Sequence, residues 1–277
     1  MSYEYELWSN NGVKLKVGFI GFGEVSSTLA KKLLKNDVEV MSSTEGRSEK
    51  TKDILNEMPD IAKVKNFKKL AISSDILISA VTPFESLKIA EKYGIFNKGI
   101  FLDLNNISPD TTLKIKNIIE NNGANSPCFV KGAIIGKVSS SDSCIYLSGE
   151  KAKELNFLAN FGFNIKIISE NVVDVAYIKI LRSIYTKGVT ALLSEVLAIS
   201  EEMSLTKELF EVLAISEGEK FESIVKSRVE SLSKSHQRKF EEMNEILDFL
   251  KDFHKKDFFD SNSKMIKATR DKFGEIK

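Results

Sequence analysis

The 277 residues are enough for one or two domains, and at about 100–200 residues per domain we expect two. Forty lysine and arginine residues balance 39 acidic ones, which excludes a strong overall attraction to nucleic acid or to an anionic membrane. We expect residues 1–12 to be a tail without the apolar segment of a signal peptide, and no run of about 18 apolar residues is present. The sequence therefore predicts a cytoplasmic protein with neither nucleic acid nor a membrane as a partner.

Strands and helices are expected to alternate up to about residue 169. Apolar runs bounded by turn residues predict strands at 14–20, 38–43, 75–81, 99–104, 129–136, 144–149 and 164–169. Helical spacing between them predicts helices at 26–35, from within 44–54, at 84–93, 108–123 and 150–162. Ser108 and Pro109 supply the N-cap and the first helical position of the fourth helix. This alternation indicates an α/β fold with a doubly wound, mainly parallel sheet.

The rest of the chain has a helical period only. We expect one long helix at 172–203, which contains one glycine and no proline, and further helices at 205–216, 217–231, 235–254 and 260–272. The predicted domains are a dinucleotide-binding Rossmann domain at 1–170, including the tail, and an all-α domain at 171–277.

Cysteine and histidine are too sparse for a metal centre. The chain has two of each, and Cys128 and Cys144 are too far apart in sequence for a paired thiolate motif. We interpret both cysteines as small packing residues in a reducing compartment, and we predict no metal site.

A glycine-rich turn follows the first predicted strand and opens a helix. Its first glycine permits a tight turn, its second lets the backbone approach a pyrophosphate, and the helix N-terminus favours an anion. The third glycine of the usual motif is replaced by Ser26. The cofactor-binding residues expected here are Gly21, Phe22, Gly23, Glu24 and Val25.

The second predicted strand selects the nucleotide. Sites for NAD(H) usually have an acidic residue about 20 positions beyond the motif, where it holds the ribose 2′-hydroxyl. Here Glu45 is the only nearby acid and lies further along the loop. Ser43, Arg47 and Ser48 instead suit a 2′-phosphate. We therefore expect NADP(H) in preference to NAD(H).

Several segments together resemble one known family. GFIGFGEVSSTLAKKL, GRSEKT and LDLNNISP are similar to the 6-phosphogluconate and 3-hydroxyisobutyrate dehydrogenase superfamily, the β-hydroxyacid dehydrogenases. KILRSIYTKGVTALLSEVL and SHQRKFEEMNEI are similar to the short helical C-terminal domain of a poorly characterised branch of it. The resemblance covers about residues 14–255.

The resemblance implies further cofactor contacts. Val81, Thr82 and Pro83 are expected in the loop at the end of the strand predicted at 75–81, beside the adenosine or the nicotinamide ribose. Asn105 is expected near the nicotinamide ring, because ligands lie beyond the carboxyl ends of parallel strands. A turn with Asx hydrogen bonds is the alternative interpretation of Asn105.

One family motif is altered. The family motif Asp-x-Pro-x-Ser-Gly-Gly, which grips the substrate, corresponds to residues 131–137, where Lys131 replaces the acid and Ile135 the serine. This weakens the case for 6-phosphogluconate or a simple β-hydroxyacid as substrate. Lys131 and Lys137 either meet an anionic substrate or are solvated, and solvation is the expected state of each.

The long C-terminal helix has one polar stripe on an otherwise apolar surface, and such a stripe should face water or a polar cavity. The resemblance implies that this helix crosses an interdomain cleft, that Lys179 is the catalytic acid and base, and that Ser183 replaces a family asparagine. A lysine whose stem packs while its ammonium reaches solvent is the alternative. The stripe consists of Lys179, Ser183, Thr186, Thr190 and Ser194, with Lys187 beside it.

Three further residues are candidate substrate contacts. Lys187 neighbours the polar stripe, and the resemblance places the helix of His236 and Arg238 beside the same cleft. His236 begins an apolar stripe, so a packed or capping histidine is its alternative interpretation.

These observations predict an NADP(H)-dependent oxidoreductase that interconverts an alcohol, in particular a hydroxy acid, and a carbonyl compound. Lys179 would be the general acid and base, the substrate a small anion, and the protein a homodimer formed through its helical domain. Reduction of a C=N bond and a non-catalytic NADP(H)-binding sensor are the alternatives.

Overall fold

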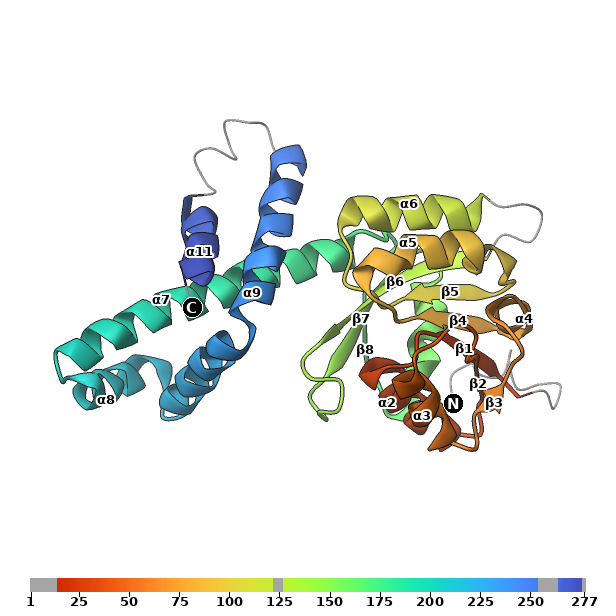
Figure 1. The fold of residues 1–277 in the computed structure, drawn as a ribbon, viewed down its shortest axis with the longest axis horizontal. Helices are drawn as coiled ribbons and strands as arrows, with labels where there is room; N and C mark the ends of the chain where they lie inside the picture. The colour runs from red at the N-terminus through yellow and green to blue at the C-terminus, as the bar shows by residue number, and fades with distance from the viewer. Residues whose placement is uncertain (1–13, 122–126, 254–263, 276–277) are drawn as a thin grey trace. The chain divides into compact units, whose positions relative to one another are not determined.

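The chain forms two compact units, Met1–Ile178 and Lys179–Lys277 (Figure 1). The computed structural model describes residues 14–121, 127–253 and 264–275, so the expected tail at 1–12 lies outside the described residues.

The first unit is built on one eight-stranded sheet. All neighbouring strands are parallel except β6 and β7, which confirms the predicted mainly parallel sheet. The strand order is β3-β2-β1-β4-β5-β6-β7-β8, so the order reverses between β1 and β4. The strands are β1 (Lys16–Ile20), β2 (Glu39–Ser42), β3 (Ala62–Lys63), β4 (Ile76–Ser79), β5 (Ile100–Asp103), β6 (Cys128–Ile135), β7 (Cys144–Ser148) and β8 (Asn164–Ser169).

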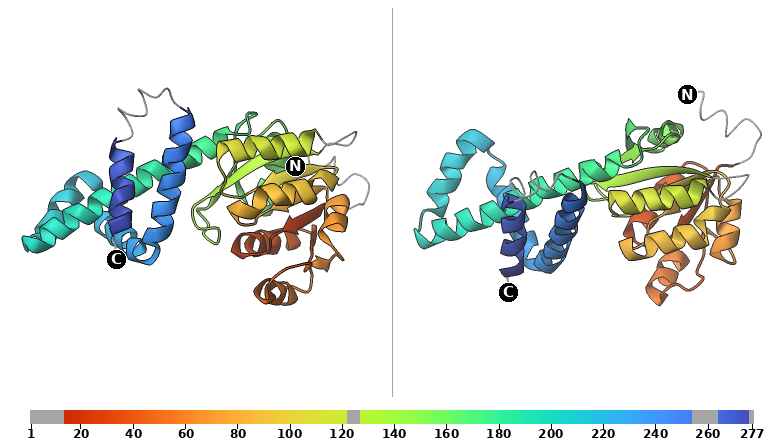
Figure 2. Two further views of the ribbon diagram at one scale, coloured as in Figure 1. Left: turned by 45° about the horizontal axis from the view of Figure 1, so that its top comes forward. Right: turned by 90° about the horizontal axis from the view of Figure 1, so that it is seen from above.

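Helices cover both faces of this sheet. Side chains of α2, α3 and η2 form one apolar cluster with the sheet, and those of α4, α5 and α6 form a second cluster on the other face (Figures 1 and 2). These two layers around a sheet are the doubly wound arrangement. The helices are α2 (Glu24–Leu34), α3 (Glu49–Asn56), α4 (Phe67–Ser73), α5 (Pro83–Lys92), η1 (Gly94–Phe96), α6 (Pro109–Glu120) and η2 (Ala152–Phe161).

The sequence pattern missed three short elements, which are β3, α4 and the 3₁₀ helix η1. β3 has two residues, too few for an alternating pattern, and α4 has seven, about two turns. The signal for α4 was its cap, since Asn66 Oδ1 accepts a hydrogen bond from Lys69 N at 2.8 Å. The predicted helix at 150–162 is a 3₁₀ helix, η2. The predicted cap of α6 is confirmed, because Ser108 Oγ accepts from Thr111 N at 3.2 Å.

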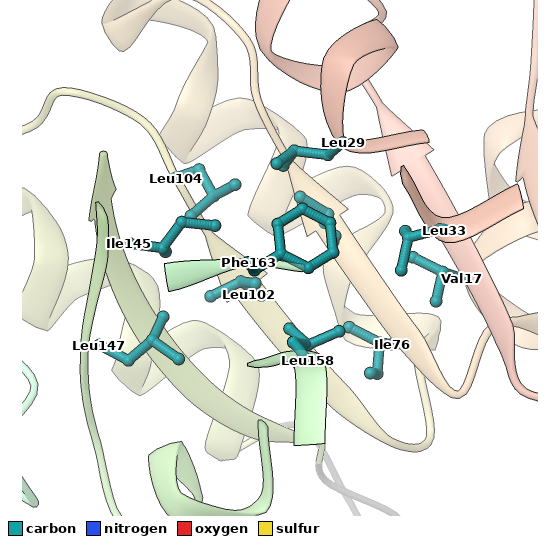
Figure 3. Close-up of a pocket in the computed structure, with 11 residues that line it drawn as sticks. Val17, Leu29, Leu33, Ile76, Leu102, Leu104, Ile145, Leu147, Leu158 and Phe163 are labelled. Carbon is teal, nitrogen blue, oxygen red and sulfur yellow. The ribbon is translucent and has the colours of Figure 1, made fainter. Parts of the chain in front are cut away.

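A small void remains inside the core of the first unit (Figure 3). Its volume is about 20 Å³, and the side chains around it are all apolar. A water molecule needs two to four polar partners, so this void is dry packing space and no ligand site. Leu29 and Leu33 of α2 face Ile76 and Leu102 of the sheet across it.

The second unit is helical throughout its described part. The predicted long helix is confirmed as α7 (Asp174–Glu202), which begins within the first unit, and it is followed by α8 (Thr206–Glu217), α9 (Phe221–Phe253) and α11 (Lys264–Glu275). The helices predicted at 217–231 and 235–254 form one helix, and only the break between them was wrong, because α9 is continuous, with no glycine or proline to interrupt it. Buried Ala191, Met243 and Phe273 form the core that joins α7, α9 and α11. No helix of the described residues is long and apolar enough to span a membrane.

Candidate active site

A tightly packed glycine lies where the strand order reverses, between the ends of β1 and β4. Gly21 directly follows β1 and has a φ of +88°, a conformation that side chains disfavour. A Cβ atom at Gly21 would lie 2.2 Å from the carbonyl oxygen of Ala80, which follows β4. The loops after β1 and β4 can therefore touch only if residue 21 is glycine. In α/β folds, ligands bind at this point of the sheet.

The second glycine has the opposite surroundings. Gly23 is the N-cap of α2, no side chain caps the helix there, and a Cβ atom would meet nothing within 4 Å. The backbone is thus open to a ligand where helix N–H groups and the helix dipole favour an anion. Ser26 fits the third motif position because its buried hydroxyl donates to the carbonyl oxygen of Gly21 at 2.7 Å. These residues fit the pyrophosphate of a dinucleotide.

The other three turn residues have different surroundings. Phe22 is a buried core residue, packed edge-on against Phe19 with ring centroids 5.9 Å apart. Glu24 is exposed in the first turn of α2, and Val25 is half-buried. Phe22 therefore offers a ligand its backbone only.

The loop after β2 carries the cationic side chain of Arg47 and the carboxylate of Glu45, and the carboxylate is bonded to the backbone. The guanidinium of Arg47 lies over the ring of Phe67, with Cζ 4.8 Å from the ring centroid. Glu45 Oε2 accepts a hydrogen bond from the amide of Phe67 at 2.9 Å, at the N-terminus of α4. The carboxylate is thus held at a helix end, where its charge is favourable. The sequence pattern predicted a role for Arg47 but did not predict the contact of its guanidinium with Phe67.

The two serines of this loop serve the local fold. Ser43 is buried, and its Oγ accepts a hydrogen bond from Glu45 N at 3.3 Å. Ser48 is the N-cap of α3, with its Oγ 3.4 Å from Thr51 N. Both support the loop that carries Arg47.

Asn105 is buried within a hydrogen-bond network at the end of β5. Its Nδ2 donates to Ser79 Oγ at 2.9 Å and to Asp103 Oδ2 at 2.6 Å, and its Oδ1 accepts from Val81 N at 2.6 Å. The side-chain amide therefore fixes the loop after β4. The next two residues of that loop are exposed and begin α5, with Thr82 as N-cap and Pro83 at the first helical position.

Lys131 is not a solvated lysine, as the sequence suggested, but one of the most deeply buried residues. Its Nζ forms an ion pair with Asp103 and donates to the main-chain oxygen of Asn105 at 2.6 Å. The strand position was predicted correctly, but nothing in the local pattern identified a buried partner on the neighbouring strand. Its neighbours Lys137 and Ile135 are exposed and half-buried, respectively.

Helix α7 begins beside this network. Ser148 of β7 is the register partner of Lys131, and its hydroxyl donates to the carbonyl oxygen of Val172 at 2.9 Å. The amide of Val175 lies 3.4 Å from the same Ser148 oxygen. Lys179 follows one helical turn later and is half-buried, as is Ser183.

The polar stripe of α7 is largely satisfied by the helix itself. The hydroxyls of Thr186 and Thr190 donate to the carbonyls of Arg182 and Thr186, four residues earlier, at 2.9 and 2.8 Å. Ser194 donates to the carbonyl of Ala191 at 2.7 Å. Hydroxyls bonded back to their own helix require neither water nor a polar cavity, which the sequence analysis overlooked.

The remaining substrate candidates lie in the second unit. Lys187 is buried, and its Nζ is 2.8 Å from Glu242 Oε2 on α9, so it helps to join α7 and α9. His236 is half-buried on α9. Arg238 belongs to the same helix, but its side chain lies outside the described part of the structure.

Cysteine and metal chemistry find no support among the described residues. Burial raises the pKa of the Cys128 and Cys144 thiols, which disfavours the thiolate that a nucleophile requires. Within residues 14–121, 127–253 and 264–275, no group of three or more potential metal ligands comes together.

Two comparisons concern the sequence. A family model described as NADP oxidoreductase, coenzyme F420-dependent, matches residues 16–106, from β1 to the loop after β5. A Methanothermus fervidus protein, described as an uncharacterized 28.5 kDa protein in the 7S RNA 5′ region, is 41% identical over 262 residues. The match covers 95% of this chain and 99% of that protein.

Solved structures share the fold over nearly the whole chain. A conserved protein of unknown function, described as structurally similar to 3-hydroxyacid dehydrogenases, is 36% identical with a TM-score of 0.81, covering 95% of this chain and 96% of its own. The 3-hydroxyisobutyrate dehydrogenase of Salmonella typhimurium is 13% identical with a TM-score of 0.70, covering 94% and 93%. An imine reductase variant from Myxococcus stipitatus is 14% identical with a TM-score of 0.63, covering 95% and 93%.

The family follows from the relatives with 41% and 36% identity, each of which matches 95% of the chain. The glycine turn at the reversal of strand order lies within the segment that matches an NADP oxidoreductase family. The chain therefore belongs to the β-hydroxyacid dehydrogenase superfamily of oxidoreductases, as its sequence predicted.

Proposed function

We propose that this protein is an NADP(H)-dependent oxidoreductase that interconverts an alcohol, in particular a hydroxy acid, and a carbonyl compound. The observation that carries the proposal is the open backbone at Gly23, at the N-terminus of α2 and beside the reversal of strand order. The matching family model supports NADP as the nucleotide partner of this segment.

The residues around the reversal fit an extended dinucleotide. Gly21 and Gly23 would hold the pyrophosphate and Arg47 the 2′-phosphate, while the loops at Val81 and Asn105 would flank the nicotinamide half. When bound, the nicotinamide supplies or accepts the hydride.

The preference for NADP(H) rests on the loop after β2. The guanidinium of Arg47 lies over the ring of Phe67, a contact that limits its motion before a phosphate arrives, and a planar guanidinium matches phosphate geometry. Glu45 lies further along the loop than the acid that usually holds a ribose 2′-hydroxyl, and its Oε2 is bonded to the amide of Phe67.

Arg47→Ala is expected to weaken NADPH binding by about 1.5–3 kcal/mol, the scale of a hydrogen bond to a charged group, and to leave NADH binding nearly unchanged. Calorimetric titration of the wild type and the variant with both cofactors measures the difference. Lys50→Ala, which removes an exposed charge two residues into α3, is the control. Tighter binding of NADH than of NADPH by the wild type would overturn the preference.

The proposed proton donor for the substrate oxygen lies on α7. Reduction of a carbonyl develops negative charge on the substrate oxygen, and an ammonium in hydrogen-bond reach neutralises it and delivers a proton. We propose Lys179 for this role, with Ser183 as a hydrogen-bond donor to the same oxygen. Lys187, His236 and Arg238 remain candidate contacts for an anionic substrate, although Lys187 already pairs with Glu242.

A substrate panel tests the proposed reaction. Keto acids, aldehydes, ketones and imines are each incubated with the protein and NADPH, and loss of NADPH absorbance is followed. We expect turnover with at least one keto acid. Turnover confined to imines would establish the C=N alternative, which the fold shared with an imine reductase favours. Tight NADPH binding without turnover of any compound would establish the sensor alternative.

The second unit supports a homodimer. Leu181, Tyr185, Leu192 and Ile199 of α7 are spaced by four and seven residues, so they lie on one helix face, and each is more than half exposed. A stripe of exposed large apolar side chains is typical of an interaction surface.

We predict that light scattering gives twice the 31.0 kDa of the single chain at micromolar concentration. Leu192→Glu, which places a charge in the middle of this stripe, is expected to yield monomers because a charge at a dimer core is poorly solvated. A wild-type mass of 31.0 kDa would refute the dimer.

A further inference from the structure

A buried ion pair joins two neighbouring strands at the carboxyl edge of the sheet. Lys131 of β6 and Asp103 of β5 are register partners, and their side chains are 2% and 0% exposed. Removing two charges from water to this extent is costly and is tolerated only when hydrogen bonds satisfy both groups. Charged side chains are almost never fully buried in a protein core unless they are paired, so the groups that contact this pair indicate its role.

The carboxylate is satisfied chiefly by the lysine and by Asn105. Asp103 Oδ1 pairs with Lys131 Nζ and accepts from Asn105 N at 3.1 Å, while Oδ2 accepts from Asn105 Nδ2 at 2.6 Å. The second proton of the amide goes to Ser79 Oγ. With both N–H groups engaged, the amide has one orientation, and its Oδ1 faces Val81 N.

The contacts therefore form one connected path. It runs from Lys131 through Asp103 and Asn105 to the peptide of Val81, and it ties the carboxyl ends of β4 and β5 to the middle of β6. Lys131 also holds the main-chain oxygen of Asn105, so it fixes that residue from both its backbone and its side chain. Removal of either charge would release the loops after β4 and β5 together.

These loops lie on one side of the reversal of strand order. The order β2-β1-β4-β5 places Arg47, which follows β2, on the opposite side. If the 2′-phosphate binds at Arg47 and the pyrophosphate at Gly23, the nicotinamide half extends over β4 and β5, about 10 Å from β1 across two strand spacings.

We propose that Lys131 and Asp103 are positioning residues for the nicotinamide half of the cofactor. The inference rests on the proposed NADP(H) binding. Both side chains are buried and act through Asn105, which sets the backbone at Val81 and in the loop after β5. The lysine that replaces a substrate-gripping acid of the family motif thus serves the cofactor and not the substrate.

The test compares the binding of the whole cofactor with the binding of its adenosine half alone. The double variant Lys131→Met, Asp103→Leu replaces the ion pair by apolar side chains, a change that proteins often tolerate. We expect its Kd for NADPH to rise about tenfold, because a preorganised loop is lost, while its Kd for 2′,5′-ADP, which lacks the whole nicotinamide mononucleotide half, stays within about twofold. Calorimetry gives both constants, and thermal unfolding shows whether the variant is folded.

Asn105→Ala provides a second route that leaves the ion pair in place. It removes the side-chain amide that connects Asp103 to Val81. We expect it to raise the ratio of the Kd for NADPH to the Kd for 2′,5′-ADP, as in the double variant. This variant keeps the proposal falsifiable if the double variant does not fold.

Asn97→Ala is the matched control. Asn97 is buried at the amino ends of the same strands, where its Nδ2 donates to the carbonyls of Ala71 and Ser74 at 3.2 and 2.7 Å. Its loss should lower the unfolding temperature without changing the ratio of the two Kd values, because it lies at the edge opposite the cofactor loops.

Each outcome decides one point. A ratio that is unchanged in folded double and Asn105→Ala variants overturns the positioning role, and so does a parallel loss of both ligands, which would indicate a purely structural pair. A wild-type protein that binds neither NADPH nor 2′,5′-ADP overturns the proposed cofactor itself. Titration of the wild type alone therefore distinguishes failure of the proposed cofactor from failure of the positioning role.

Discussion

Lys179→Met is expected to lower turnover at least about 100-fold, the range for loss of a general acid and base, with little change in NADPH affinity. Methionine keeps the length and packing of the side chain but has no proton to give, and it carries no charge to neutralise the substrate oxygen. The measurement is steady-state turnover on the compound found by the substrate panel, together with a calorimetric Kd for NADPH.

Lys207→Met is the control for this change. Lys207 is an exposed lysine of α8 paired with Glu211, so its loss removes a charge from the same unit without touching α7. Its turnover should match the wild type. Near-normal turnover of the Lys179→Met variant would eliminate Lys179 as the proton donor and leave the half-buried His236 as the next candidate.

Gly21→Ala should destabilise the first unit severely, whereas Gly23→Ala should not. At position 21 the added methyl group costs about 1–3 kcal/mol for the left-handed backbone and a similar amount for its overlap with Ala80. At position 23 the backbone is extended and the methyl group meets nothing within 4 Å, so the cost is limited to the weaker N-cap that alanine makes, about 1 kcal/mol or less. Thermal and urea unfolding of both variants measures the contrast.

The same pair of variants tests the cofactor site. Because the space at Gly23 is the proposed place of the pyrophosphate, the folded Gly23→Ala variant should bind NADPH at least about fivefold more weakly, the low end of the cost of overpacking. Unaltered NADPH binding by this variant would contradict the placement of the pyrophosphate there. A Gly21→Ala variant as stable as the wild type would contradict the close approach of the loops after β1 and β4.

The parts of the fold that follow from sequence are those with strong local signals. Long apolar runs predicted the main strands, and Ser108 with Pro109 predicted the start of α6. The elements missed or misplaced were short or lacked a stop signal: β3 has two residues, and α9 runs on through 33 residues because no breaker divides it. Local sequence patterns therefore predict that a helix or strand exists more reliably than they predict where it begins and ends.

The candidate site divides in the same way. The glycine turn was predictable because the motif itself implies a strand, a tight turn and a helix in succession, and Gly21 and Gly23 have the two environments that the motif requires. The partners of Lys131 and Arg47 were not predictable, since Asp103 is 28 residues away from the first and Phe67 twenty from the second. Such contacts are created by strand order, which periodicity does not encode.

The Lys131–Asp103 pair also constrains how this sequence can diverge. Loss of one partner leaves a buried charge alone, at a cost of about 3–5 kcal/mol, which is a large part of the stability of a typical domain. Simultaneous replacement by apolar residues avoids that cost. Among relatives, positions 103 and 131 should therefore vary together, with lineages keeping both charges or neither, and intermediates with a single charge should be rare.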